Sequence, residues 1–150
     1  MRIVLQRVGH ASVSIDGNVK SCIGKGLLLL LGIEATDTEE DINWQVKKIL
    51  NMRIFEDENN VMNISALDIC AGILVVSQFT LYASCKKGNR PSYIRAAGHD
   101  ISVPLYNKFC QVMEKECPGK FGSGEFGADM KVELLNDGPV TIFLDSKIKE

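Results

Sequence analysis

The longest apolar run in the chain is 27-LLLLLGI-33, and it predicts a strand that is buried on both faces. Upstream of it, apolar and polar residues alternate in 2-RIVLQRV-8 and in 11-ASVSI-15, which predicts two further strands. A turn at 16-DGN-18 leads into a strand at 19-VKSCI-23. We therefore expect an antiparallel meander that ends in the buried run.

Two helices are expected downstream of this run. The first begins at a capping box made by Thr36 and Glu39, and apolar residues recur on one face of it. That buried face consists of Ile42, Val46, Ile49 and Leu50. The second helix runs from about Ser102 to Glu116, with Pro104 in its first turn, where a missing N–H costs little.

The remaining segments predict strands and loops. A central buried strand is expected at 73-ILVVSQFTL-81, and a loop at the Gly-rich segment 119-GKFGSGEFG-127. Residues 136-NDGPVT-141 lie between two alternating runs and predict the turn of a closing hairpin over 129–145. Pro139 is unusual there, because proline has no N–H for a ladder. The pattern predicts a single α+β domain over 1–150.

Composition and charge exclude several classes of protein. The chain has 150 residues, 45% of them hydrophobic, and a net charge of −2, which argues against a broad basic face that coats nucleic acid. No apolar run is long enough for a membrane span. Five scattered cysteines are typical of reduced thiols, so we expect a cytoplasmic protein. With only two histidines, His10 and His99, a His-rich metal site is excluded, and we expect no metal and no cofactor.

The polar segment 77-SQFTL-81 follows an apolar strand and has two interpretations. Ser77, Gln78 and Thr80 are either the solvated end of the strand or the polar floor of a pocket, and the sequence favours neither. Thr80 is also a candidate nucleophile, but a hydroxyl nucleophile needs an adjacent base, and the sequence offers no evident one.

Three other features have a structural and a functional interpretation. His99-Asp100 suggests a base with an orienting acid, but capping of the following helix is favoured. His10 is interpreted as a turn or edge residue. The segment 86-KKGNRPSYIR-95 is either a solvated hairpin or a local binding site for phosphate or a nucleobase, in which Tyr93 could stack against the base.

Four stretches together resemble the D-aminoacyl-tRNA deacylase family over nearly the whole chain. They are 1-MRIVLQRV-8, 77-SQFTLYA-83, 88-GNRPSY-93 and 136-NDGPVT-141, in this order and at this spacing. The second and fourth contain the family's two signature motifs. The one small departure is Tyr93, where phenylalanine is usual in the family.

The resemblance implies a compact β-barrel-like fold of antiparallel or mixed sheets, with two main helices packed outside. It also implies a homodimer that acts on the aminoacylated 3′ end of tRNA. The Gly138–Pro139 bond is expected to be cis and to enter the partner's pocket, where its carbonyl groups hold the α-amino group of the substrate. An L-amino acid would then clash with this turn, while a D-amino acid or glycine would be accepted.

The resemblance also implies a role for several individual residues. The main-chain N–H groups around Gln78 and Phe79 polarise the ester carbonyl, and Ser77 and Gln78 form the pocket floor. Thr80 is expected to be dispensable as a nucleophile. Arg7 anchors the turn through the turn's backbone, and Phe126 and Met130 flank the pocket, although the sequence alone is equally compatible with a core position for both.

Two alternatives remain open from the sequence. One is a non-catalytic RNA- or nucleotide-binding module that uses the basic segment and its aromatic residue. The other is a relative with a trans Gly138–Pro139 bond and relaxed chirality, which would cleave some L-aminoacyl-tRNA.

Overall fold

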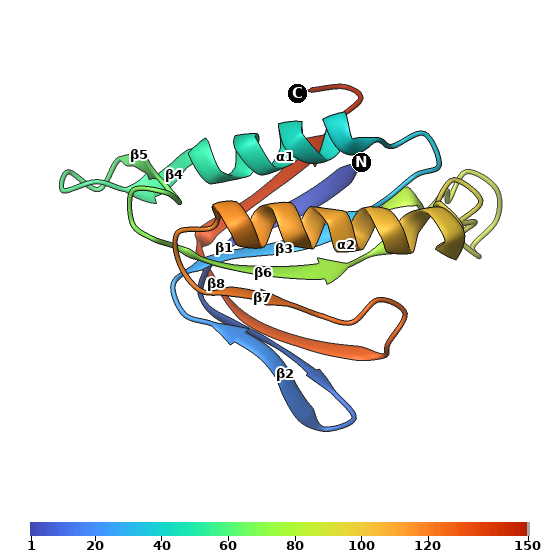
Figure 1. Ribbon diagram of the computed structural model, residues 1–150, viewed down its shortest axis with the longest axis horizontal. Helices are drawn as coiled ribbons and strands as arrows, with labels where there is room; N and C mark the ends of the chain where they lie inside the picture. The colour runs from blue at the N-terminus through green and yellow to red at the C-terminus, as the bar shows by residue number, and fades with distance from the viewer. Residues whose placement is uncertain (150) are drawn as a thin grey trace.

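The computed structural model describes residues 1–149. Within them, two α-helices lie side by side over one face of a curled sheet (Figure 1). The sheet has the order β2-β1-β3-β6-β7, and β8 pairs with β1. Its six strands are β1 (Arg2–Ile15), β2 (Asn18–Ile23), β3 (Gly26–Gly32), β6 (Gly72–Ser77), β7 (Phe121–Ser123) and β8 (Met130–Asp145).

The other elements are the helices α1 (Glu39–Asn51) and α2 (His99–Glu116), the short pair β4 (Arg53–Glu56) and β5 (Met62–Ser65), and the 3-10 turn η1 (Phe79–Tyr82). The sheet is mixed, because β3 and β6 run parallel, as do β6 and β7, while the other pairs are antiparallel. The expected fold, a barrel-like α+β domain with two helices outside, is confirmed.

The leucine run forms β3 and is buried on both faces, as predicted. Leu27, Leu29 and Leu31 belong to the cluster that the helices cover. Leu28 belongs to a second cluster on the opposite face, together with Val8, Leu74 and Val76. Because side chains alternate across a strand, a continuous apolar run is what a strand between two buried layers requires.

The prediction of a meander is wrong, because the strands do not pair in the order in which they occur in the sequence. Residues 2–8 and 11–15 form one 14-residue strand, β1, which continues through the exposed His10. The first half of β1 pairs with β3 and the second half with β2, and because β8 pairs with both halves, β3 and β2 share the other edge of β1. The length of β1 allows this, because one strand then offers a partner to both neighbours. His10 therefore lies within a strand rather than in a turn.

The prediction of a closing hairpin over 129–145 is also wrong. Residues 130–145 form a single long strand, β8, that runs antiparallel to β1 on both sides of the NDGPVT motif. Gln6 pairs with Thr141 and Val8 pairs with Asn136, so Arg7 alone faces the four residues 137–140. These four residues leave the ladder as a bulge, and Pro139 lies where no ladder hydrogen bond is needed.

Both helices begin at other residues than expected. Helix α1 starts after Thr38, whose N–H donates to the Asp41 carboxylate at 2.8 Å, rather than at Thr36 and Glu39. Its predicted buried face is confirmed. Helix α2 starts at His99, after Gly98, which puts Pro104 beyond the first turn and shows that Asp100 is not the N-cap.

The central strand ends earlier than predicted. Strand β6 stops at Ser77, and the chain turns into η1 at Phe79 instead of continuing to residue 81. The Gly-rich segment begins with the short strand β7 and then forms a loop. Within residues 1–149, no helix is both long and apolar enough to span a bilayer.

Candidate active site

The end of β6 forms the floor of the candidate site. The N–H of Gln78 donates to the Leu31 carbonyl at 2.7 Å, which continues the pairing of β6 with β3 by one residue. The Gln78 N–H therefore already has a partner. Of the two N–H donors that the resemblance implies, only the Phe79 N–H is available to a substrate. Phe79 begins η1, and the first N–H groups of a helical turn have no partner inside that turn.

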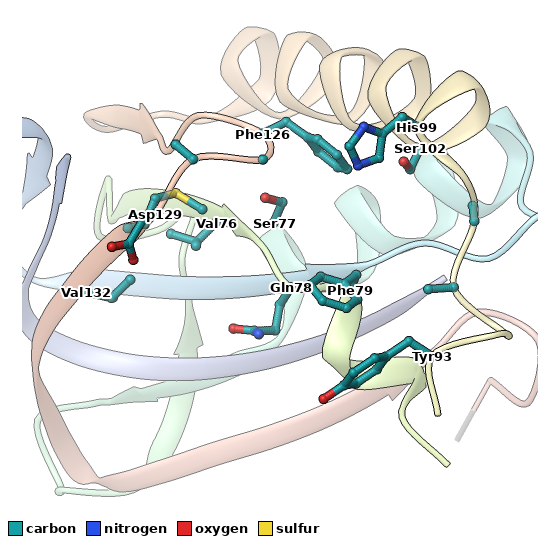
Figure 2. Close-up of a pocket in the computed structure, with 15 residues that line it drawn as sticks. Val76, Ser77, Gln78, Phe79, Tyr93, His99, Ser102, Phe126, Asp129 and Val132 are labelled. Carbon is teal, nitrogen blue, oxygen red and sulfur yellow. The ribbon is translucent and has the colours of Figure 1, made fainter. Parts of the chain in front are cut away.

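A cavity of about 560 Å³ opens above this floor (Figure 2). Three stretches that are far apart in sequence line it: 76–79 at the end of β6, 93–102 up to the first turn of α2, and 126–132 from the loop before β8 into β8. Of the expected site residues, Ser77, Gln78, Phe79, Phe126 and Met130 line the cavity. Its size and its mixture of aromatic and polar walls are typical of a small-molecule site.

Phe126 forms one wall and is held by two aromatic neighbours. Its ring packs edge-on against His99 and against Tyr106, each with a centroid separation of 5.6 Å. The Tyr106 hydroxyl donates to the Val75 carbonyl at 3.2 Å, which ties α2 to β6. Burial raises the pKa of Tyr106, so this hydroxyl stays neutral and has a structural role. Phe126 is thus positioned by packing that extends to the sheet.

The opposite wall is formed by Phe79 and Tyr93, whose rings meet edge-on at a centroid separation of 5.0 Å. Figure 2 shows these two rings on the side of the cavity away from Phe126 and His99. Both rings remain accessible, with exposed fractions of 54% for Phe79 and 39% for Tyr93. An exposed aromatic ring at the mouth of a cavity is suited to stacking against a base.

Thr80 is placed poorly for nucleophilic attack. Its side chain does not line the cavity, and its Oγ1 accepts a hydrogen bond from Gln78 Nε2 at 2.5 Å. This bond instead fixes the Gln78 side chain, which does line the cavity.

Arg7 connects the NDGPVT bulge to the core. The residue is only 3% exposed, its Nε donates to the Asp137 carbonyl at 3.1 Å, and its Nη1 donates to the Ile54 carbonyl at 2.7 Å. The carboxylates of Glu56 and Asp137 lie 3.5 and 3.4 Å away and balance its charge. A buried guanidinium with two fixed carbonyl partners sets the position of the bulge relative to β1 and β4.

Side chains inside the motif complete the bulge. The Asn136 side-chain oxygen accepts from the N–H of Val140 at 3.0 Å, and its amide nitrogen donates to Thr141 Oγ1 at 3.1 Å. Gly138 has φ of +124°, and a Cβ there would lie 2.8 Å from Arg7 Nη2. Only glycine is compatible with both conditions.

The Gly138–Pro139 bond is cis, so the alternative of a trans bond is wrong. Both residues are exposed, and neither lines the cavity of its own chain. Gly138 is six positions along β8 from Val132, the nearest cavity-lining residue on that strand, which is roughly 20 Å of extended chain. The structure therefore brings the residues of the SQFTL motif together with Phe126 and Met130, but leaves Arg7, Gly138 and Pro139 in a separate group.

Sequence reasoning assigned His99 to capping and did not identify Asp129, yet both line the cavity. The only sequence signal for His99 was its position before an apolar helix, which also describes a capping residue. Within residues 1–149, no group of His, Cys, Asp and Glu side chains has the arrangement of a metal site.

Comparison with known proteins identifies the family. The model of the family described as "D-Tyr-tRNA(Tyr) deacylase" matches residues 4–145. The chain belongs to this family. A curated D-aminoacyl-tRNA deacylase of Phocaeicola vulgatus is 61% identical, and one of Bacteroides thetaiotaomicron is 63% identical. Each alignment covers 150 residues and the full length of both chains.

Two solved structures have the same fold as this chain. One described as "c-Myc DNA Unwinding Element Binding Protein" is 43% identical, with a TM-score of 0.90, covering 97% of this chain and 98% of the other. Another, described as a probable eukaryotic D-amino acid tRNA deacylase, is 20% identical with a TM-score of 0.80 over 95% and 97% of the two chains, and it supports the fold alone.

Proposed function

We propose that this protein hydrolyses the ester bond between a D-amino acid and the 3′-terminal adenosine of tRNA, releasing the free amino acid and the tRNA. The observation that carries the proposal is the full-length identity of 61–63% to curated D-aminoacyl-tRNA deacylases. The cavity at the SQFTL motif supports it, because about 560 Å³ is a suitable size for an aminoacyl-adenosine.

The chemistry proposed for this cavity needs little from side chains. Water attacks the ester carbonyl carbon, the bond to the ribose oxygen breaks, and that oxygen takes a proton, with the vicinal 2′-hydroxyl of the tRNA close by. The Phe79 N–H, at the start of η1, stabilises the negative charge that develops on the carbonyl oxygen. Ser77 and Gln78 orient the ester from the floor of the cavity.

The terminal adenosine is proposed to lie against Phe126 and Met130. Phe126 is supported from behind by Tyr106, so it presents a rigid ring to the cavity. Met130 lies at the start of β8 and gives an adaptable apolar contact. His99, edge-on to Phe126, lies at the same wall.

Selection of the D-enantiomer is proposed to come from the Gly138–Pro139 turn of a second copy. The exposure of the turn supports this, as does its separation of roughly 20 Å along β8 from the cavity of its own chain. Its carbonyl groups hold the α-amino group, so the side chain of an L-residue meets main chain and is rejected. A homodimer follows from this assignment, and we propose that it acts in the cytoplasm, where its free cysteines stay reduced.

Hydrolysis of D-tyrosyl-tRNA and of L-tyrosyl-tRNA by the purified protein tests the proposal. We expect rapid turnover of the D-ester only. Absence of D-ester hydrolysis would refute the deacylase assignment, whereas efficient hydrolysis of both esters would refute the chiral turn alone. Sedimentation of the same preparation should give the mass of a dimer.

A second candidate function is nucleic-acid binding without catalysis. The 43% identical structure that is described as a DNA-element binding protein favours it, as does the basic segment beside the cavity. The deacylation assay separates the two functions, because a binding module would retain tRNA or DNA without releasing an amino acid.

A further inference from the structure

The basic loop, residues 86–95, lies beside the cavity and is not used by the chemistry proposed above. It contains four cations, Lys86, Lys87, Arg90 and Arg95, and no acidic residue. The chain as a whole carries 17 basic and 19 acidic residues, so the rest of it holds 13 basic against 19 acidic residues. Positive charge is therefore concentrated at this loop in an otherwise acidic protein.

The loop has a defined base. Ser84 and Ser92 exchange two main-chain hydrogen bonds, at 2.8 and 2.9 Å, which close the segment between them. Gly88, with φ of +68°, allows the chain to reverse there. Lys86, Lys87 and Arg90 are exposed on this closed loop, and Tyr93 follows directly at the mouth of the cavity.

In the part of the chain that the structure describes, some cations are already paired with carboxylates, whereas the exposed cations of this loop, like several others on the surface, are not. Arg2, Arg7, Lys108, Lys131 and Lys147 form ion pairs with carboxylates. Within residues 1–149, no such pair involves Lys86, Lys87 or Arg90. Their charge is available to an anionic ligand at the side of the cavity where Phe79 and Tyr93 are exposed (Figure 2).

We infer that the basic loop binds the phosphates of the unpaired nucleotides that precede the terminal adenosine of tRNA, and that Tyr93 stacks with one of their bases. This inference rests on the proposed function, because an adenosine in the cavity must be followed outward by its own RNA strand. A chain of phosphates leaving the cavity past Tyr93 meets Lys86, Lys87 and Arg90. Cations around an exposed aromatic ring are the usual means of binding single-stranded nucleic acid without reading its sequence.

The test uses two substrates that share the reacting ester. One is D-tyrosyl-tRNA, and the other is 3′-O-(D-tyrosyl)-adenosine, which has no phosphate. We expect Lys86→Ala/Lys87→Ala to lower kcat/KM for the tRNA by about tenfold at physiological salt and to leave the adenosine ester unchanged. The dependence of log KM on log salt should become shallower by about 0.7 for each phosphate contact that is lost.

The matched control is Lys47→Ala/Lys48→Ala, which removes the same charge from a separate groove on the outer surface of α1. We expect the control to behave as wild type with both substrates. Equal losses in the two double variants would overturn the inference in favour of a bulk charge effect. Unchanged turnover of tRNA by the loop variant would overturn it too, as would an equal loss with the adenosine ester.

Tyr93→Ala and Tyr93→Phe test the stacking contact in the same assay. Tyr93→Phe keeps the ring and should match wild type, while Tyr93→Ala should lose about tenfold with tRNA. Equal activity of the two variants on tRNA would contradict the contact.

Direct binding separates failure of this inference from failure of the proposed function. If the wild type hydrolyses neither ester, the deacylase assignment fails. The role of the loop is then still tested by the affinity for labelled uncharged tRNA, measured by fluorescence anisotropy. We expect weaker binding by the loop variant than by wild type, and no difference between them with tRNA that lacks its three terminal nucleotides. A difference that persists with the truncated tRNA would overturn the inference.

Discussion

The guanidinium of Arg7 donates to the main-chain carbonyl of Asp137 at 3.1 Å, across the first of the two register shifts between β1 and β8. The same side chain donates to Ile54 at the start of β4, so a single buried cation joins three elements. The bulge is thereby held to the body of the protein while Gly138 and Pro139 remain exposed. A projecting segment with a fixed base is suited to insertion into another surface.

Arg7→Lys should impair activity more than it impairs folding. A lysine has one nitrogen and cannot reach both carbonyl partners of the planar guanidinium, so one buried acceptor is left unpaired. We expect the free energy of unfolding to fall by about 2 kcal/mol in urea titrations. Displacement of the bulge should lower kcat/KM for D-tyrosyl-tRNA by about tenfold or more. Arg53→Lys, at an exposed position on β4, is the control, and wild-type turnover by Arg7→Lys would show that the anchor is unnecessary.

Thr80→Ala should retain most of the activity. The hydroxyl accepts a hydrogen bond from Gln78 and does not line the cavity, so its loss frees one amide and costs about 1 kcal/mol or less. We expect kcat within about fivefold of wild type in single-turnover deacylation. A fall of about a thousandfold, the scale of a group that stabilises the transition state directly, would make Thr80 catalytic after all.

Phe126→Ala should weaken binding of the terminal adenosine. Removing an aromatic platform costs about 1–3 kcal/mol per stacked base, so KM should rise by at least about fivefold while kcat changes less. Tyr106→Phe is the companion variant, because it keeps the ring behind Phe126 and removes only the hydrogen bond to Val75. An unchanged KM in Phe126→Ala would move the adenosine to another part of the cavity.

Glycyl-tRNA should be hydrolysed, whereas L-alanyl-tRNA should not. Glycine has no side chain to meet the Gly138–Pro139 main chain, and alanine in the L-form has the smallest one that does. The two esters differ by one methyl group, so binding affinity alone would separate them only modestly. Comparable rates for glycyl- and L-alanyl-tRNA would rule out steric exclusion as the basis of selection.

The fold should lose stability below about pH 4 through Asp41. Burial opposes ionisation of this carboxyl, but hydrogen bonds from Lys147, Ser146 and the Thr38 N–H outweigh it and hold its pKa well below the ordinary value of 3.8. A pKa that is lower in the folded state stabilises the fold above the unfolded value, and this stabilisation is lost as the pH falls through the folded value.

Asp41→Asn is the variant that checks this. It should lower the free energy of unfolding at pH 7 and flatten its decline between about pH 4 and pH 2, as measured by urea titrations at each pH. Glu58→Gln, at an exposed position, should follow the wild-type curve. A decline in Asp41→Asn as steep as in wild type would assign the acid sensitivity to other carboxyls, such as Asp145, which Arg2 binds.

Local sequence patterns predicted much of the fold. The run at Leu27–Leu31 formed a strand buried on both faces, and the spacing of Ile42, Val46, Ile49 and Leu50 marked the buried face of α1. The errors occurred where a distant partner decides the local structure. The NDGPVT motif is a good hairpin signal, but β1 is long enough to pair with both of its flanks, so the flanks pair with β1 rather than with each other.

By itself, the sequence determined the secondary structure of most segments and the signature motifs that indicate the family, because propensity and periodicity act over a few residues. Only the tertiary structure decided which side chains share a cavity. Ser77, Tyr93, His99 and Phe126 come from three separate stretches and meet because β6, η1 and the start of α2 converge at one end of the sheet. It also decided that the Gly138–Pro139 turn lies outside that cavity, since the position of the bulge depends on the register of β8 against β1 and on the buried Arg7, which are contacts between residues more than a hundred positions apart.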